Sequence, residues 1–432
     1  MKRLFILLLL SLFAARAWSL EVLISGGIEG ATPIAVVPFG WSGSGEQPVF
    51  NLGRIVAADL KRSGRFRTLE ERDMTARPTS AKKVDVRDWR ALKMDHLVVG
   101  NVAAKGSDSY QVRFDLLDVN SGKKLLAHNL TTKIRDLRST AHQIADMIYE
   151  KLTGQPGAFN TRVAYITSLG QGQGQGRPKV ALQVSDADGH GAQTIVSSHD
   201  PLMSPAWSAD GRKIAYVSFE QGRPAIYTQE VFTGKRTKVT SYNGINGAPA
   251  WSPDGSKLAM TLSKDGSPDI FVYDLSGGGL RKLTSHYAID TEPSWSPDGR
   301  KLAFTSDRGG KPQIYEVAVS GGTPKRVTFT GNYNARASYS PDGKSMTMVT
   351  QAENGAHCIG LLDLASGTLR ILTEGRLDES PSFAPNGAMI IYATKVKGKG
   401  ELAAVSVDGR VKQRLTLQAG DVREPNWAPF VK

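Results

Sequence analysis

The most informative stretch of this sequence is Glu292-Pro293-Ser294-Trp295-Ser296-Pro297-Asp298-Gly299, because close copies of it recur through the second half of the chain. The aromatic residue of the copies stands at six positions: Trp207, Trp251, Trp295, Tyr339, Phe383 and Trp427. The spacing between successive positions is always 44 residues. A period of about 40–45 residues is typical of the four-stranded blades of a β-propeller.

Each repeat contains segments that favour short β-strands. In the copy quoted above, Ser296-Pro-Asp-Gly299 supplies a turn, because proline fixes φ, aspartate bonds its own downstream backbone and glycine accepts positive φ. Runs rich in β-branched and aromatic residues follow at 301–306, 313–319 and 325–328, separated by Gly-rich breaks. The repeat therefore predicts a four-stranded antiparallel meander.

The number of blades follows from the strands after the turn, which begin near Val163, Ile214, Leu258, Leu302, Met346 and Ile390. The first of these has no aromatic motif before it, whereas the last motif, Glu424–Pro429, has no strand after it. We expect the C-terminal segment to supply the inner strand of the first blade, because this closure removes two free sheet edges. The sequence thus predicts an all-β six-bladed propeller over residues 158–432.

Residues 1–20 have the features of a secretory signal peptide. Lys2-Arg3 precede an apolar run over 4–13, and small residues follow, so we expect cleavage within residues 17–20. The run is shorter than the roughly 20 apolar residues that a bilayer core requires. We therefore expect export rather than membrane anchoring.

Residues 21–32 are expected to be extended, and residues 33–154 to form a small α+β domain. Pro33–Phe39 has the composition of a strand, and apolar and polar residues alternate over 110–116. Helical spacing predicts one helix over 52–60 and a second from Ser139, the expected N-cap, to Gly154. The stretch 154–157 is the predicted domain boundary.

The chain is basic, with a formal net charge of +13 that falls to +10 once Lys2, Arg3 and Arg16 are removed with the signal peptide. Such a charge could serve an anionic lipid, peptidoglycan or an acidic partner, but a solvated basic surface is the favoured interpretation. Export disfavours nucleic acid as a partner. The single cysteine, Cys358, lies in a strand and is expected to be a buried structural thiol.

None of the motifs with possible chemistry predicts catalysis, a cofactor or a metal site. The repeated Asp210, Asp254, Asp298 and Asp342 could be metal ligands, but the turn explains their position. The run 170–176 fails both nucleotide-binding patterns and is expected to be a flexible loop insertion, and the histidines lack metal-ligand spacing. The run 40–44 lacks the last glycine of a nucleophile elbow. We expect that the protein is not an enzyme.

The segments that run into each inner strand are the candidate binding surface. They are Met203-Ser204, Asn246-Gly247-Ala248, Asp290-Thr291-Glu292, Ala335-Arg336, Glu379-Ser380 and Arg423-Glu424. Because each blade repeats the same path, these six connecting loops should converge at one end of the central channel. Loops on a rigid scaffold commonly carry recognition.

The order of these parts, an exported α+β domain followed by the Pro-x-Trp-Ser-Pro-Asp-Gly repeats, resembles the TolB family, the periplasmic propellers of the Tol–Pal system. The resemblance covers roughly residues 21–432. Its most specific marks are Pro33-Ile-Ala-Val-Val-Pro-Phe39, Asn246-Gly-Ala-Pro-Ala-Trp-Ser-Pro-Asp-Gly255 and Thr291-Glu-Pro-Ser-Trp295. Related propellers also accompany prolyl-peptidase-like enzymes, but the N-terminal domain and the length favour TolB.

The resemblance implies a non-catalytic, monomeric periplasmic adaptor that acts in outer-membrane integrity, cell division and bacteriocin uptake. It implies that the lipoprotein Pal docks on the propeller face and holds the protein at the outer membrane, where other outer-membrane proteins are further partners. Ile245, Ala248 and Thr291 match family positions of the Pal contact, although a histidine can stand at the place of Ile245.

The resemblance also implies that TolA binds the mature N-terminus, Glu21-Val22-Leu23-Ile24, which is about two residues shorter here before the first strand. That segment would pack on the body or be released according to Pal occupancy. The alternative from a different class is a propeller that binds peptides or small ligands in its channel.

Overall fold

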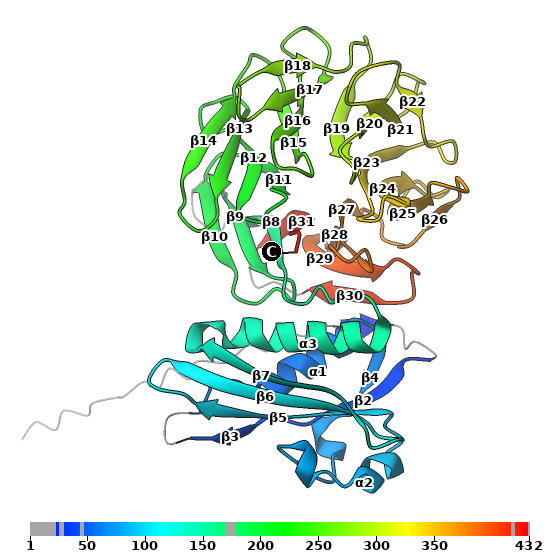
Figure 1. The fold of residues 1–432 in the computed structure, drawn as a ribbon. Helices are drawn as coiled ribbons and strands as arrows, with labels where there is room; N and C mark the ends of the chain where they lie inside the picture. Colours follow the sequence, from blue (N-terminus) through cyan, green and yellow to red (C-terminus); the bar gives the residue numbers. More distant parts are fainter. Residues whose placement is uncertain (1–22, 26–29, 44–46, 170–177, 416–419, 431–432) are drawn as a thin grey trace, which may run out of the picture.

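The computed structural model describes residues 23–25, 30–43, 47–169, 178–415 and 420–430. Figure 1 shows two domains, with the helix α3 lying between the sheet of the N-terminal domain and the propeller. The expected signal peptide over 1–20 and the loop insertion over 170–176 lie outside the described residues.

The N-terminal domain is a six-stranded mixed sheet with two helices on one face. The sheet order is β4-β2-β5-β6-β7, and β3 also pairs with β5. The strands are β2 (Thr32–Val36), β3 (Gly40–Ser42), β4 (Phe66–Thr68), β5 (His96–Ala104), β6 (Ser109–Asp118) and β7 (Lys124–Lys133). The helices are α1 (Leu52–Arg62), α2 (Val86–Ala91) and α3 (Leu137–Thr153), with short 3-10 turns at Glu71–Asp73, Ala81–Lys83 and Ile134–Asp136.

The apolar periodicity explains how the two long helices sit on the sheet. Val56 of α1 and Ile144 and Ile148 of α3 are buried against Val98 and Phe114 of the sheet. Helix α3 ends at Gly154, whose φ of 74° is the left-handed C-cap that glycine favours. The expected N-cap is wrong. The helix starts at Leu137, ahead of Ser139, whose hydroxyl instead donates to Asn160.

The second domain is a ring of six blades, as expected. In Figure 1 the inner strands surround the centre and the outer strands form the rim. Blade 1 contains β31 (Asp421–Trp427), β8 (Arg162–Leu169), β9 (Lys179–Asp186) and β10 (Gln193–Ser198). Blade 2 contains β11 (Leu202–Trp207), β12 (Lys213–Ser218), β13 (Ala225–Glu230) and β14 (Arg236–Thr240). Blade 3 contains β15 (Asn246–Trp251), β16 (Lys257–Leu262), β17 (Asp269–Asp274) and β18 (Leu280–Lys282).

The other three blades repeat this pattern. Blade 4 contains β19 (Asp290–Trp295), β20 (Lys301–Ser306), β21 (Gln313–Ala318) and β22 (Lys325–Arg326). Blade 5 contains β23 (Asn334–Tyr339), β24 (Ser345–Gln351), β25 (His357–Asp363) and β26 (Leu369–Ile371). Blade 6 contains β27 (Glu379–Phe383), β28 (Met389–Val396), β29 (Lys399–Ser406) and β30 (Lys412–Leu415), and β1 (Leu23–Ser25) adds a fifth strand at its edge.

The ring closes through the C-terminal strand, as predicted. The strand β31 pairs antiparallel with β8, with Asp421 opposite Ser168 and Trp427 opposite Val163. The first blade therefore contains both ends of the propeller sequence.

The repeated motif has two structural roles, which blade 4 illustrates. In blade 4 the turn is held by Asp298, whose carboxylate accepts bonds from the Ser296 hydroxyl at 2.6 Å and the Arg300 N–H at 3.0 Å, and these bonds lower its pKa. The indole of Trp295 donates across the blade boundary to the carbonyl of Ala250 at 3.0 Å. The motif thus forms a turn within one blade and ties that blade to the preceding one.

Candidate functional site

The antiparallel blades give the propeller two different ends. The turns after the inner strands and the connections between third and fourth strands share one end, which we call the turn end. The connections between second and third strands and those between blades share the other end, which we call the loop end.

The six candidate segments lie within the inner strands rather than in loops, which differs from our expectation. Each strand starts pairing early, as with Met203 opposite Val217, and then bulges before Ala206 resumes the pairing. The same irregularity recurs in the other five inner strands. The extra residue of a bulge re-aims the neighbouring side chains.

One residue of each bulge has a positive φ although it is not glycine. These residues are Ser204, Ala248, Glu292, Arg336, Ser380 and Glu424, with φ between 45° and 58°. Their spacing repeats the 44-residue period. The left-handed region is unfavourable for residues with a Cβ, so the ring holds a strained conformation at six equivalent places. All six residues line the central channel, which has a volume of about 300 Å³.

Arg336 occupies the channel and connects four blades. Its guanidinium lies 3.4 Å from Glu292 and 3.2 Å from Glu424, and it donates to the Ser380 hydroxyl at 2.6 Å. Burial opposes the charge on Arg336, but the carboxylates of Glu424 and Glu292 outweigh it and raise its pKa. Sequence reasoning selected these residues as surface groups, and the structure brings four of them together inside the ring.

Other candidate residues are buried, and their hydrogen bonds hold the connections at the loop end in place. The side chain of Asn246 exchanges hydrogen bonds with the backbone of Tyr242, at 2.9 and 2.7 Å. The carboxylate of Asp290 accepts a bond from Arg308 at 2.7 Å. Ala335 is also buried. The remaining candidates lie on the inner strands β15, β19, β27 and β31, and they are Gly247, Thr291, Glu379 and Arg423.

The loop end carries an apolar patch that sequence reasoning largely missed. The loop-end patch comprises exposed side chains on three successive blade-to-blade connections, namely Tyr242, Ile245, Tyr287, Ile289 and Phe329. Tyr287 is 87% exposed and Phe329 is 75% exposed. Exposed apolar side chains that gather in one region mark interaction sites. The signal in the sequence was the presence of aromatic residues in connections that lack a strand pattern.

The N-terminal segment of the described chain pairs with the edge of blade 6. Leu23 lies opposite Arg414 and Ile24 opposite Gln413, in antiparallel register. Glu21 and Val22, the first two residues of the candidate TolA segment, lie outside the described residues.

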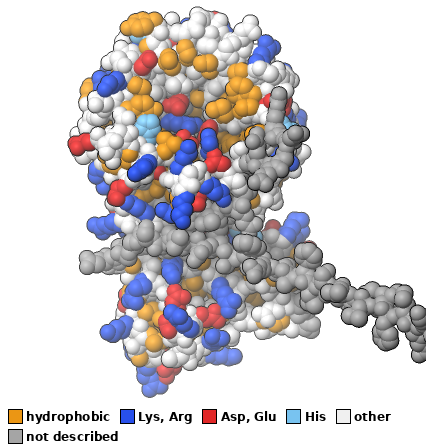
Figure 2. All heavy atoms as spheres, turned by 180° about the vertical axis from the view of Figure 1, so that it is seen from behind, with side chains coloured by type: hydrophobic (Ala, Val, Ile, Leu, Met, Phe, Trp, Pro, Cys, Tyr) orange, Lys and Arg blue, Asp and Glu red, His pale blue; other side chains and the backbone are white. Residues whose placement is uncertain are grey.

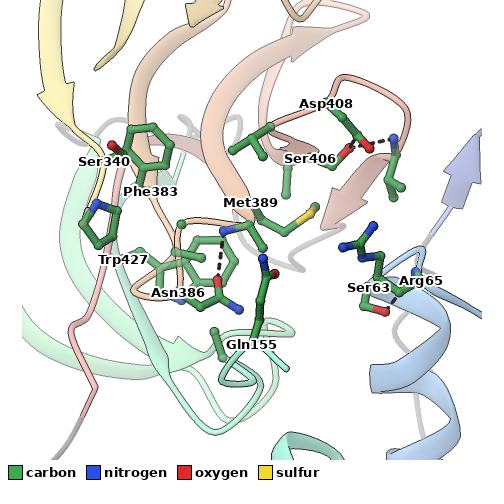
Figure 3. Close-up of a pocket in the computed structure, with 18 of the residues that line it drawn as sticks. Ser63, Arg65, Gln155, Ser340, Phe383, Asn386, Met389, Ser406, Asp408 and Trp427 are labelled. Carbon is green, nitrogen blue, oxygen red and sulfur yellow. Dashed lines mark hydrogen bonds between the residues drawn. The ribbon is translucent and has the colours of Figure 1, made fainter. Parts of the chain in front are cut away.

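A cavity of about 570 Å³ separates the N-terminal domain from the turn end of blades 5 and 6. Figure 3 shows Gln155 of the linker and Arg65 directed toward it, across from Met389 and Ser406 of blade 6. At its rim the side chain of Asn386 donates to the carbonyl of Pro156 at 2.9 Å. The turn end is therefore partly covered by the protein itself, whereas the loop-end patch is open.

The charged surface is mixed. On the face shown in Figure 2, Lys and Arg side chains are interspersed with Asp and Glu on both domains. Among the described residues, no helix has the length and apolar content required to cross a membrane.

Comparison with known proteins accounts for nearly the whole chain. Residues 20–125 match the TolB amino-terminal domain, and residues 149–431 match the TolB beta propeller domain. The Tol-Pal system protein TolB of Thioalkalivibrio sulfidiphilus is 59% identical over 96% of this chain and 94% of its own length. The TolB of Xanthomonas oryzae pv. oryzae is 52% identical over 98% of this chain and 96% of its own.

A solved structure agrees with these matches. The crystal structure of TolB from Acinetobacter baumannii is 40% identical, covers 95% of this chain and 100% of its own, and superposes with a TM-score of 0.87. The chain belongs to the TolB family of Tol–Pal system proteins.

Proposed function

We propose that this protein is a non-catalytic periplasmic adaptor of the Tol–Pal system, which binds Pal at the loop end and TolA through its mature N-terminus. Family membership supports a role in that system. The observation that carries the docking site is the loop-end patch, which is exposed while the turn end is partly covered by the N-terminal domain.

The loop-end patch has the composition of a protein-binding surface. Aromatic side chains with large exposed area dominate protein interfaces because they bury much apolar surface with little loss of conformational freedom. Ile245 stands next to the buried Asn246, whose bonds to Tyr242 fix the connection that carries both exposed residues. A partner therefore meets a preorganised surface.

The positions carried over from the family differ in accessibility. Ile245 is 46% exposed and can contact a partner directly. Ala248 and Thr291 lie on the bulged inner strands near the channel mouth, and the Thr261 hydroxyl donates to that of Thr291 at 3.3 Å. We infer that a docked Pal domain covers the patch and reaches toward the channel mouth.

The pairing of β1 with β30 supports a releasable N-terminal segment. Within the described part of the chain, the three residues Leu23–Ser25 pair with the edge of blade 6, and a pairing of that length is short for a stable strand. A partner that binds this segment competes with the pairing. The choice between packed and released states responds to Pal only if Pal binds the two states with different affinity.

The alternative, a channel that binds peptides or small ligands, is disfavoured by Arg336. Its contacts with Glu292, Glu424 and Ser380 span the channel, so a ligand would have to displace a set of paired charges.

A pull-down from solubilised envelopes tests the adaptor proposal. The bait is the mature protein from Glu21, beside an Ile245→Glu/Tyr287→Glu variant. Phe232→Glu serves as the matched control, because Phe232 is 68% exposed but follows β13 at the turn end. We expect the wild type and the control to recover Pal and the double variant to lose it. Equal recovery by all three would place docking elsewhere.

The TolA proposal needs a separate bait that starts at residue 26 and so lacks β1. We expect this bait to lose TolA while still recovering Pal. Unchanged recovery of TolA would remove the N-terminal segment from the proposal.

A further inference from the structure

Seven charged or titratable side chains meet where helices α1 and α3 face blade 1. The interdomain cluster comprises Asp59 and Arg62 of α1, Arg138, His142 and Asp146 of α3, Asp186 of β9 and Asp188 of the following turn. Asp59, Arg62, His142 and Asp188 are all buried. Buried charges are stable only when they are paired.

His142 lies at the centre of the cluster, between the two domains. Its Nδ1 is 2.6 Å from a carboxylate oxygen of Asp59, and the other oxygen of Asp59 accepts a bond from Arg62 at 3.0 Å. Its Nε2 faces blade 1, at 3.9 Å from Asp188 and 4.0 Å from Asp186. Among the described residues, this buried nitrogen has no hydrogen-bond partner.

Arg138 is a second side chain of α3 that faces blade 1. Its guanidinium lies 3.2 Å from Asp186 and also donates to Asp188. The remaining oxygen of Asp188 accepts the N–H of His190 at 3.0 Å. The Arg138 guanidinium and the His142 imidazole of the N-terminal domain thus face two carboxylates of the propeller across the domain interface.

We propose that the proton on His142 is a latch that holds the N-terminal domain against blade 1 of the propeller. A doubly protonated imidazole donates Nδ1–H to Asp59 and presents a positive Nε2–H to Asp186 and Asp188. A neutral imidazole that keeps the bond to Asp59 turns a lone pair toward the carboxylates of Asp186 and Asp188, which is repulsive. Loss of the proton therefore weakens the contact between the domains.

The surroundings favour the proton. Burial lowers the pKa of His142 and Arg62 also opposes the charge, but Asp59 and Asp188 outweigh both and raise it. Burial opposes ionisation of Asp188, yet Arg62, Arg138 and His142 keep the pKa of its carboxyl below the usual range. A histidine with a raised pKa stabilises the folded arrangement fully below its unfolded pKa, and this contribution is lost as pH rises through the folded pKa.

Asp146 is the remaining titratable group in the cluster. Burial raises its pKa to about 6, against the bonds that it accepts from the N–H groups of Phe159 and Asn160. Its own contribution to stability is also lost as pH rises, so an experiment must follow the His142 imidazole itself. The ligand atoms of Asp59, His142 and Asp188 lie close enough together to bind a metal ion. The carboxylates are already neutralised, however, because Arg62 pairs with Asp59 and Arg138 pairs with Asp188.

The test uses the mature protein in the presence of a chelator. The imidazole signals are followed by NMR and the radius of gyration by small-angle X-ray scattering, in the same samples between about pH 5.5 and pH 9.5. The variants are His142→Gln and Asp188→Asn, and His190→Gln is the control because that side chain is exposed.

We expect the radius of gyration to increase with the same midpoint as the loss of the His142 proton. His142→Gln should be expanded and should lack the transition that accompanies loss of the His142 proton, and His190→Gln should behave as the wild type. Asp188→Asn should lower both midpoints by about one pH unit, because it removes a facing anion.

The proposal is wrong if the radius stays constant while His142 loses its proton, or if His142→Gln keeps the pH dependence of the wild type. If His142→Gln does not fold, by near-ultraviolet circular dichroism, Asp188→Asn decides. A shift of the imidazole midpoint without a shift of the scattering midpoint then overturns the proposal.

Discussion

At the scale of single residues, the inner strands carry six strained positions that the sequence motif does not reveal. The residue before the Pro-x-aromatic motif has positive φ in every blade, yet it is Ser, Ala, Glu or Arg rather than glycine. Proline follows it in five of the six blades, and Ala337 follows Arg336. Because the strained conformation recurs at equivalent positions beside the channel, the surrounding fold must impose it.

Ala248 allows this strain to be measured without loss of a polar contact. Replacement by glycine relieves about 1–2 kcal/mol of left-handed strain and costs about 0.5–1 kcal/mol in chain entropy. We expect Ala248→Gly to raise the free energy of unfolding by roughly 0.5–1 kcal/mol in urea titrations. Ala250→Gly, in the regular part of the same strand opposite Ala259, should lower it by about 0.5–1 kcal/mol. Equal losses at both positions would show that the bulge is not strained.

The aromatic anchor offers a second prediction at this scale. Trp295→Phe keeps most of the buried ring but loses the bond to the Ala250 carbonyl, so it should cost about 1 kcal/mol. Trp295→Ala also leaves a cavity and should cost about 3–5 kcal/mol. Urea unfolding of both variants separates the two contributions. Phenylalanine can fill this position, because Phe383 is the aromatic anchor of blade 6. If Trp295→Phe were as unstable as Trp295→Ala, the separate contributions of the hydrogen bond and the buried ring would be contradicted.

At the scale of elements, closure of the ring depends on one strand. The strand β31 is the inner strand of blade 1, and the Trp427 indole also donates to the Thr161 hydroxyl at 2.8 Å. Ending the chain before Asp421 should lower the melting temperature by about 10 °C or more, because loss of a paired strand removes several kcal/mol. A chain that ends at Pro429 keeps β31 and is the control. Equal melting temperatures for both truncated chains would refute closure by this strand.

The blades could be predicted from the sequence because their information is local and repeated. The aromatic anchor, the Pro-Asp-Gly turn and the apolar runs recur at a fixed spacing, so the strand pattern and the closure by β31 follow from counting. The bulges could not be predicted, because a serine such as Ser204 or a glutamate such as Glu292 does not indicate a positive φ, whereas a glycine would. We therefore assigned strand residues to loops.

The candidate site was predictable only in part for a related reason. Arg336, Glu292 and Glu424 are far apart in the chain, and only the ring places them together in the channel. Asn246 and Asp290 are buried although they are polar. Their polar character suggested exposure, whereas in the structure Asn246 pairs with the backbone of Tyr242 and Asp290 pairs with the Arg308 guanidinium.

At the scale of the whole molecule, the arrangement of the two domains is fixed by contacts that no sequence pattern announces. Asn386 bonds the carbonyl of Pro156, and Gln413 donates to the carbonyl of Arg62. The strand β30 thus carries a contact with the N-terminal domain and also pairs with β1. A change in domain position can therefore alter the pairing of β1 through β30. The N-terminal segment that contains β1 is where the proposed TolA contact lies.

The loop end of this propeller is the surface that we propose binds Pal. The most direct test of this proposal is isothermal titration calorimetry of the mature protein with the folded domain of Pal, comparing wild type, Ile245→Glu/Tyr287→Glu and Phe232→Glu. We expect the double variant to bind at least about tenfold more weakly, since buried aromatic anchors dominate interface energies, and Phe232→Glu to match the wild type. Equal affinities for all three proteins, or a loss confined to Phe232→Glu, would contradict the account.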